Sequence, residues 1–198
     1  MLPYTIEFYN QKKSNCSKFS KGFSLIELMV VIAVSAIMIS IAIPRLSDFT
    51  VKMRIDNEIS QLNRLILSAR NSAITLEQNV ITCPLESGVC TANWQNQLTT
   101  FIDNDNNGIF LAANDTLVKI KAANTSGDII TYAGQTSINF SPTGVLSSIA
   151  SQFIYCPISD NSLARAIVLS PSGRTYVTTD ANNDGKDEFR VGGNVVCP

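Results

Sequence analysis

Residues 21–44 read KGFSLIELMVVIAVSAIMISIAIP and contain the longest apolar run in the chain. The run covers residues 23–43, and its only polar members are Ser24, Glu27, Ser35 and Ser40. A helix of this length spans about 30 Å, which matches the hydrocarbon core of a bilayer. Four lysines and a single acid precede the run, and this excess of positive charge favours a cytoplasmic N-terminus. We therefore expect one membrane-spanning helix near the start of the chain.

Glu27 is the one charged residue inside this run. A carboxylate within an apolar membrane helix costs about 2.5–3.5 kcal/mol, so it should have a partner. No Lys or Arg lies within one helical turn of it. If the chain is cut between Gly22 and Phe23, the new α-amino group lies one turn from Glu27. The two groups can then pair within one chain or between staggered neighbours.

The segment Lys21–Leu28, KGFSLIEL, resembles the class III signal of type IV pilins and type II secretion pseudopilins. The resemblance implies that a prepilin peptidase cuts after Gly22 and methylates the amine of Phe23. It also implies that Glu27 pairs with the N-terminus of an adjacent subunit during assembly. The competing interpretation is a plain signal anchor that carries a passive β-rich head.

Apolar residues continue at helical spacing after Pro44, which ends the apolar run and is expected to kink the helix. Steps of mostly three and four residues predict one face packed on a sheet and an opposite face that meets solvent or neighbouring subunits. The expected packed positions are Leu46, Phe49, Met53, Ile59, Leu62, Ile66, Ala69, Ala73 and Leu76. The expected outward charges are Lys52, Arg54, Asp56, Glu58, Arg64 and Arg70.

Beyond Leu76 the apolar period changes from 3.6 to about 2, and short runs alternate with Asn-, Asp-, Gly- and Ser-rich turns. This pattern predicts many short strands, mostly antiparallel, without an intervening helix. The predicted strands are Val80–Cys83, Gln97–Ile102, Leu117–Ala122, Ile129–Tyr132, Ser137–Phe140, Gln152–Cys156, Arg165–Ser170 and Thr175–Thr179, with Val195–Cys197 as an added closing edge.

These changes of pattern divide the chain into four regions. We expect a leader over 1–22, the transmembrane half of the N-terminal helix over 23–43 and its amphipathic half over 44–78. A periplasmic β-rich head follows over 79–198.

Four of the five cysteines lie in the predicted head, because Cys16 belongs to the leader. An even number in an exported segment favours disulfides, and three pairings are open. Cys83 with Cys90 is the natural local bridge, and Cys156 with Cys197 would then tie the end of the chain to an inner strand. A four-cysteine zinc site is the competing interpretation, but the spacing is not that of a zinc knuckle.

The order of features in the head is similar to that of the GspH/FimT family of minor pseudopilins and minor pilins. These features are the CPLESGVC loop from Cys83, Trp94, the FIDNDNNG stretch, the FSPTG turn, Cys156, an SGR turn and Cys197. The resemblance implies an α+β, type IV pilin-like fold, in which a long N-terminal helix packs on an antiparallel β-rich head of two sheets. It places the chain in the bacterial inner membrane as a single-pass protein, with its head in the periplasm. Its partners would be the peptidase and other pilins of a helical filament.

Two loops, residues 103–108 and 180–185, fit the pattern D-x-[DN]-x-[DN]-G, which gathers oxygen ligands around Ca²⁺. Neither loop has Glu at the twelfth position, and an Asx-rich turn without a metal is the alternative. Calcium is the one cofactor that the sequence suggests, and the second loop has more carboxylates. The candidate ligands are Asp103, Asp105 and Asn107 in the first loop and Asp180, Asn182, Asp184, Asp187 and Glu188 in the second.

Catalysis has no support in the sequence. The chain has no histidine, no P-loop, no dinucleotide fingerprint and no G-x-S-x-G elbow, so we expect no enzymatic activity.

The predicted function is that of a minor pseudopilin or minor pilin at or near the tip of a filament, supporting protein secretion or pilus biogenesis. The alternative is a FimT-like minor pilin that binds DNA during natural transformation, through a Gly-Arg-x-Arg stretch. Gly173 and Arg174 match that stretch, whereas Tyr176 replaces the second arginine. From Glu77 onward, six basic and eleven acidic side chains make the head a poor match for a polyanion. The candidate DNA contacts are Arg165, Arg174, Tyr176 and Arg190.

Overall fold

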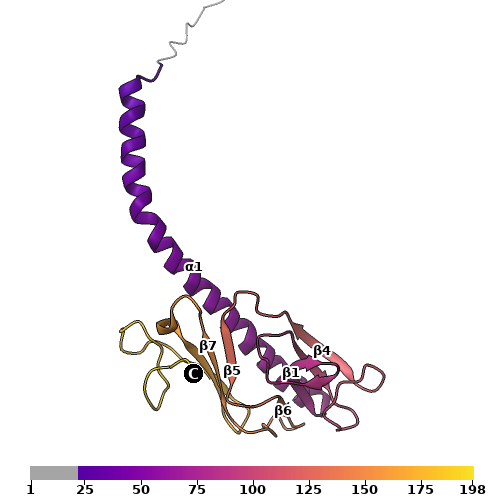
Figure 1. Ribbon diagram of the computed structural model, residues 1–198. Coiled ribbons are helices and arrows are strands. Elements are labelled where there is room, and N and C mark those ends of the chain that lie inside the picture. Colours follow the sequence, from indigo (N-terminus) through magenta and orange to yellow (C-terminus); the bar gives the residue numbers. More distant parts are fainter. Residues whose placement is uncertain (1–21) are drawn as a thin grey trace, which may run out of the picture. The chain divides into compact units, whose positions relative to one another are not determined.

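The computed structural model describes residues 22–198, without side-chain placement at positions 44, 45 and 47. The predicted leader, apart from Gly22, therefore lies outside the described residues. The chain divides after Pro44 into two compact units, which we describe separately. One helix, α1 (Leu25–Leu76), contributes residues to both units (Figure 1).

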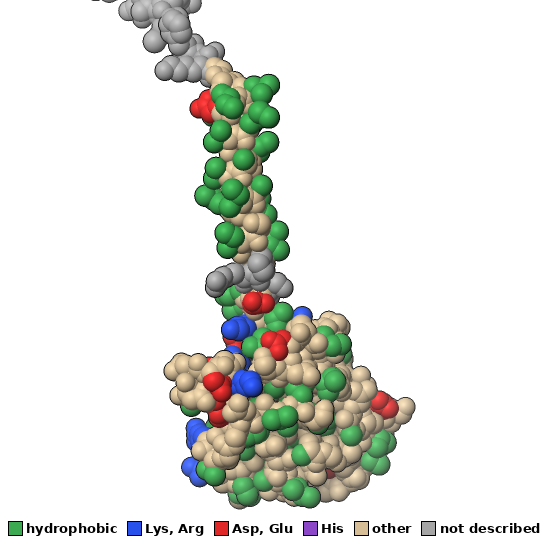
Figure 2. Space-filling view, turned by 60° about the vertical axis from the view of Figure 1, so that its left-hand side comes forward, with side chains coloured by type: hydrophobic (Ala, Val, Ile, Leu, Met, Phe, Trp, Pro, Cys, Tyr) green, Lys and Arg blue, Asp and Glu red, His purple; other side chains and the backbone are tan. Residues whose placement is uncertain are grey.

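The first unit is the apolar part of α1. Within the described residues, α1 is the one helix long and apolar enough to cross a membrane, and none of its most apolar window is buried. On the side shown in Figure 2, apolar side chains cover this part of the helix. The hydroxyls of Ser35 and Ser40 donate to the carbonyls of Val31 and Ile37, at 2.7 and 2.8 Å. These hydroxyls are therefore satisfied within the helix, as a lipid environment requires.

The remainder of α1 buries one face against the head of the second unit. Its buried residues are Ile55, Ile59, Leu62, Leu65, Ile66, Ala69 and Ala73. Five of these were predicted from the helical period, and Ile55 and Leu65 were missed. Leu46, Phe49 and Met53 are instead more than half exposed, because the packed part of the helix begins near Val51. Leu76, also predicted to be packed, is 49 % exposed.

α1 ends at Leu76, two residues before the predicted boundary. Glu77 adopts a left-handed conformation with φ of 55°, and the backbone N–H of Gln78 donates to the carbonyl of Ala73 at 3.3 Å. This is the Schellman arrangement that closes many helices. The chain then enters the first strand without a long loop.

The head consists of two antiparallel sheets, which confirms the predicted fold class. The first sheet has the order β2-β1-β3-β4, with β6 paired to β1, and the second has the order β5-β7-β8-β9. The first sheet contains β1 (Val80–Glu86), β2 (Val89–Cys90), β3 (Leu98–Ile102), β4 (Thr116–Lys121) and β6 (Ile138–Phe140). The second contains β5 (Ile129–Tyr132), β7 (Gln152–Cys156), β8 (Arg165–Leu169) and β9 (Thr175–Val177), with a short 3₁₀ helix at Asn161–Leu163 before β8.

All eight main strands match the predicted runs within a few residues, but two details differ. The short strand β2 was missed because the hairpin Glu86–Val89 turns through Ser87 and Gly88, both with positive φ. The predicted closing strand Val195–Cys197 is wrong.

Side-chain burial and a covalent bond hold this terminal segment instead of strand pairing. The last β-bridge joins Glu188 to Asn194. Val195 is buried, and its N–H donates to the carbonyl of Asp187 at 2.8 Å. Cys197 is tied to Cys156 by a disulfide.

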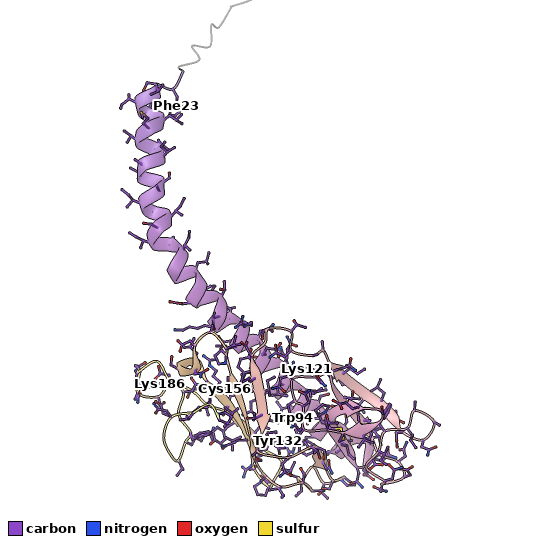
Figure 3. The ribbon with its side chains drawn as sticks, in the orientation of Figure 1. Phe23, Trp94, Lys121, Tyr132, Cys156 and Lys186 are labelled. Atoms are coloured by element: carbon purple, nitrogen blue, oxygen red, sulfur yellow. A yellow bond between two sulfur atoms is a disulfide. The ribbon has the colours of Figure 1, made fainter. Side chains whose placement is uncertain are left out.

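An aromatic cluster lies in the core that both sheets share with α1. Trp94, in a loop after β2, is 2 % exposed, and its ring lies 5.3 Å from Tyr132 and 4.9 Å from Phe153. Figure 3 shows Trp94 beside Tyr132. The indole N–H donates to the carbonyl of Gln135 at 2.8 Å, so this buried donor is satisfied.

Two disulfides close the head. Cys83 is joined to Cys90 across the β1–β2 hairpin, and Cys156 of β7 is joined to Cys197. This is the pairing that the sequence favoured. All four cysteines of the head are therefore engaged, which leaves no thiolate among them for zinc.

Candidate functional site

The N-terminal site is the start of α1, where the predicted cleavage point between Gly22 and Phe23 lies close in sequence to the exposed carboxylate of Glu27. Phe23 is 78 % exposed and lies two residues before the first residue of α1, Leu25 (Figure 3). The backbone N–H of Ser24 donates to Glu27 Oε2 at 3.5 Å, and the N–H of Glu27 donates to Ser24 Oγ at 3.2 Å. This reciprocal pair is a capping box, which satisfies two of the free donors at a helix start.

The capping box gives the Glu27 carboxylate a local partner, the backbone N–H of Ser24, although no Lys or Arg lies within one helical turn. Its signal was present in the sequence as Ser24-Leu25-Ile26-Glu27, the S-x-x-E pattern. Among the described residues no cation forms an ion pair with this carboxylate. The arrangement can therefore hold the carboxylate at the helix start, next to the amine that cleavage before Phe23 would create.

Ion pairs join α1 to the strands and loops of the head. Lys121 Nζ lies 2.7 Å from Glu58 Oε2, and its side chain is 6 % exposed (Figure 3). Arg165 pairs with Asp56 of α1 and lies 3.6 Å from Asp187. The prediction that this helix face points to solvent or to neighbours is thus wrong for most of its charges.

Arg70 also bonds the head, although it is not in an ion pair. Its Nε donates to the carbonyl of Gly144 at 2.9 Å. Lys52 and Arg64 remain exposed, as predicted.

Asp128 is the most connected carboxylate in the head, and sequence analysis did not single it out. Its side chain is buried and lies 3.0 Å from Arg54 Nε of α1. It also accepts hydrogen bonds from the hydroxyl of Tyr155 and from the N–H of Ile158. The signal that could have found it was weak, because these partners lie between 27 and 74 residues away in sequence.

The environment of Asp128 keeps it ionised. Burial by itself raises the pKa of a carboxylate, but the hydrogen bonds from Tyr155, Ile158 and Ser126 and the charge of Arg54 outweigh burial and lower the pKa of Asp128. Burial raises the pKa of Tyr155 to about 12, so its hydroxyl stays protonated and can donate. The pair Arg54–Asp128 therefore fixes α1 to the loop before β5.

The first Asx-rich loop is built around two buried carboxylates. Asp103 accepts from the N–H groups of Asn107 and Gly108, at 3.1 and 3.0 Å. Asp115 accepts from the N–H groups of Asn104 and Leu111, at 3.1 and 2.8 Å. The carboxylates of Asp103, Asp105 and Asp115 offer oxygens within 4.8 Å of one another. Asp115, which stands beside the predicted twelfth position, was not among the predicted ligands.

The second loop brings together three of its five predicted ligands. Asp180, Asp184 and Glu188 offer carboxylate oxygens within 4.8 Å of one another. Glu188 Oε2 accepts from the N–H of Ala181 at 2.8 Å, and Oε1 is buried without a hydrogen-bond partner among the described residues. Asp187 is turned away, because it accepts from Thr178 and pairs with Arg165.

Asn182 Oδ1 accepts from the N–H of Asp184 at 2.8 Å, as expected of an Asx turn. In the first loop, Asn107 Oδ1 likewise accepts from the N–H of Ile109 at 2.7 Å. Both loops thus have carboxylate oxygens that could hold Ca²⁺, and the calcium assignment stays a prediction.

The four residues proposed for DNA contact do not act as one free basic surface. Arg165 is engaged by Asp56 and Asp187. Arg190 lies over the ring of Tyr176, with its guanidinium carbon 4.3 Å from the ring centroid. Arg174 is exposed, and its Nε donates to Ser172 Oγ at 3.2 Å. Charged side chains gather along one margin of the head on the side shown in Figure 2, where acidic and basic groups are mixed.

Comparison with known proteins agrees with this architecture. The family described as "Type II transport protein GspH" matches residues 58–173, and the "Prokaryotic N-terminal methylation motif" matches residues 17–43. Two curated fimbrial proteins of Pseudomonas aeruginosa are each 37 % identical to this chain over 57 residues, which is 29 % of the chain. The match spans only 37 % of the length of those fimbrial proteins.

A solved structure shows the same fold. The type IV minor pilin FimU of Pseudomonas aeruginosa superposes with a TM-score of 0.52 at 15 % identity. The superposition covers 66 % of this chain and 92 % of the FimU chain. Because the GspH match extends over more than half of the residues and the methylation motif precedes it, this chain belongs to the GspH family of minor pilins and pseudopilins, a structural rather than an enzymatic family.

Proposed function

We propose that the chain is a minor subunit at or near the tip of a periplasmic type II secretion pseudopilus or type IV pilus, where it supports protein secretion or pilus biogenesis. A prepilin peptidase removes residues 1–22 and methylates Phe23. Residues 23–43 then hold the subunit in the inner membrane, and residues 79–198 form a periplasmic head. The two disulfides support this location, because such bonds form and persist in the oxidising periplasm.

The observation that carries the proposal is Glu27, held at the helix start four residues after Phe23. In lipid, an unpaired carboxylate is costly, and the amine of a neighbouring subunit would remove this cost when the two apolar helices pack. Assembly is then favoured by a charge pair that exists only after cleavage. The exposed apolar surface of α1 supplies the remainder of the contact.

The experiment compares wild type with Glu27→Ala in the bacterium that produces the chain. Mass spectrometry of the wild-type protein should find an N-terminal methylated Phe23. Glu27→Ala should be cleaved almost normally but recovered about tenfold less in the filament fraction. Asp48→Ala, which removes an exposed carboxylate from the same helix outside the apolar run, is the matched control and should behave as wild type. An intact leader, or normal recruitment of Glu27→Ala, would contradict the proposal.

DNA uptake is the weaker alternative, because one of its four candidate contacts is paired with acids and another covers Tyr176. A gel shift with the purified protein at low salt tests it. Binding that weakens with salt and with Arg174→Ala would favour this alternative.

A further inference from the structure

A groove of about 580 Å³ lies between the outer face of α1 and the edge strand β4 of the first sheet. Its walls combine apolar, hydroxyl, amide and basic side chains and include no acid. The lining residues are Arg64, Leu67, Ser68, Asn71, Ser72, Thr75, Leu76 and Lys119. All but Lys119 come from one contiguous face of α1.

The two cations of this groove differ from most of the other cations at the junction of α1 and the head. Arg54, Lys121 and Arg165 each lie opposite a carboxylate. Arg64 and Lys119 are exposed, and within residues 22–198 neither forms an ion pair. Two like charges in one groove repel each other, so an anionic group placed between them is favoured.

β4, whose Lys119 lines the groove, also has an open backbone edge. β4 pairs with β3 on one side and is the last strand of its sheet. Leu117 and Ile120 of β4, which do not line the groove, are exposed by 48 and 47 %. An unpaired edge with exposed apolar side chains is a template for another strand.

The size of the groove suits a short extended segment. A residue in a packed strand occupies about 160 Å³, from a rise of ~3.3 Å, a strand spacing of ~4.8 Å and a sheet spacing of ~10 Å. The volume of about 580 Å³ equals that of three to four such residues, and the groove is broadly open to solvent. Hydroxyl and amide groups of α1 at Ser68, Asn71 and Thr75 face this space and can bond a polar side chain.

We propose that this groove receives an extended segment of a neighbouring filament subunit, which adds to the edge of β4 and places a carboxylate between Arg64 and Lys119. The proposal rests on the proposed function, because a filament supplies the neighbouring subunit. The open edge requires an extended backbone, and the two unopposed cations require an acidic side chain. The occupant is therefore an extended segment with one acidic side chain, and its other positions can hold any residue.

The test uses the full chain in its own host, with a photo-crosslinking amino acid at position 71 in the groove. The control places the same amino acid at Thr136, an exposed residue in the loop between β5 and β6. We expect position 71, and not position 136, to crosslink to an Asp- or Glu-containing extended segment of another filament subunit, identified by peptide mass spectrometry. The double variant Arg64→Glu/Lys119→Glu should lower the crosslink yield about tenfold, and Arg64→Lys/Lys119→Arg should keep it within about twofold of wild type. Reversing the partner's acid to lysine should restore the yield in the double glutamate variant.

Folding and incorporation are read in the same cells. Cleavage, membrane abundance and both disulfides should be unchanged in the variants, since both cations are exposed and unpaired. Arg174→Glu is a control charge reversal at an exposed residue in the turn between β8 and β9, and it should leave the yield unchanged. Three results would overturn the groove proposal in a chain that is incorporated normally. Position 71 could give no crosslink, or it could crosslink only to a neighbour's helix or to nucleic acid. The crosslink yield could also stay the same after charge reversal of Arg64 and Lys119. Failure of the wild-type chain to be cleaved or to enter filaments would instead remove the proposed function.

Discussion

At the residue scale, Asp128 connects parts of the head that are far apart in sequence. Its buried carboxylate forms an ion pair with Arg54 of α1 and accepts hydrogen bonds from the hydroxyl of Tyr155 in β7 and from the backbone N–H of Ile158. Removing a charge from such a site leaves the remaining buried groups without compensation. Asp128 is therefore expected to matter for the stability of the head.

Asp128→Asn tests this role. The amide keeps the shape of the carboxylate but loses its charge and one acceptor, so we expect the free energy of unfolding to fall by about 2–4 kcal/mol. Urea unfolding of the purified protein in detergent at pH 7 measures the change. Asp48→Asn, an exposed carboxylate on α1, should change it by less than about 0.5 kcal/mol. Equal stability of the two variants would show that Asp128 is not a buried connection.

The lowered pKa of Asp128 also predicts acid sensitivity. A carboxylate whose pKa is lower in the folded state contributes stability above its unfolded pKa, about 3.9, and this contribution is lost as the pH falls through the folded value. We expect the melting temperature of wild type to fall below about pH 4 more steeply than that of Asp128→Asn. Parallel pH profiles of the two proteins would contradict this linkage.

At the element scale, two turns that contain Gly144 and Gly173 pack against each other and against α1. Gly173, in the turn between β8 and β9, has a φ of +74°, and a Cβ there would lie 2.1 Å from the carbonyl oxygen of Gly144. Arg70 of α1 donates to that same carbonyl. Gly173 was interpreted from the sequence as part of a DNA-binding stretch. Its close contact with Gly144 explains, without DNA, why a glycine stands at this position.

Gly173→Ala should destabilise the head more than backbone strain alone explains. Gly134 has nearly the same φ, +73°, but nothing lies within 4 Å of its missing Cβ. Gly134→Ala should therefore cost only about 1–2 kcal/mol from the left-handed backbone. We expect Gly173→Ala to exceed this by at least about 2 kcal/mol in urea unfolding, because a backbone oxygen must shift. Equal costs would show that the contact between the turns is loose.

The second Asx-rich loop carries the calcium prediction. If Asp180, Asp184 and Glu188 bind the ion, about 1 mM calcium should raise the melting temperature by several degrees relative to EDTA. Asp184→Ala should abolish this rise. Asp48→Ala, which removes an exposed carboxylate outside both loops, is the control and should leave the rise intact. A wild-type melting temperature that does not respond to calcium would remove the site and leave an Asx turn.

At the scale of the whole molecule, the two disulfides constrain very different lengths of chain. Cys83–Cys90 spans 7 residues, whereas Cys156–Cys197 spans 41 and fixes the end of the chain to the second sheet. Loop-closure entropy gives about 2.5 and 4 kcal/mol for loops of these sizes. After β9, two isolated β-bridges, Thr179–Glu188 and Glu188–Asn194, precede the last four residues. These last residues therefore depend on the Cys156–Cys197 disulfide.

Cys197→Ser should therefore lower the free energy of unfolding by about 1.5 kcal/mol more than Cys90→Ser. It should also expose Val195 and the loop that carries Asp180–Glu188 to limited proteolysis. Urea unfolding and protease mapping of the two variants measure these effects, with reduced wild type as a reference. A larger loss from Cys90→Ser would show that the hairpin, rather than the terminus, governs the stability of the head.

The sequence by itself determined the features that rest on local chemistry. An apolar run with one acid, the S-x-x-E start of α1, the helical period after Pro44 and the alternation of the strands are each readable within a few neighbouring residues. Short-range geometry controls these signals, so the fold class was predictable, and the site at Phe23 and Glu27 stays a prediction that rests on the same signals. The two Asx-rich loops were recognisable for the same reason, although the place of Asp115 in the first loop and the contact of Asp187 with Arg165 were not.

Only the tertiary structure decided which charges pair and which stay open. Asp128 with Arg54, Glu58 with Lys121 and Asp56 with Arg165 are separated by 63 to 109 residues. No periodicity within one element reports such partners, because they meet only after the sheets pack on α1. The same packing buries Trp94, which lies in a loop, and leaves Arg64 and Lys119 without an acidic partner among residues 22–198. The physical reason is that the energy of a charge depends on its surroundings in space, whereas the sequence displays only its surroundings along the chain.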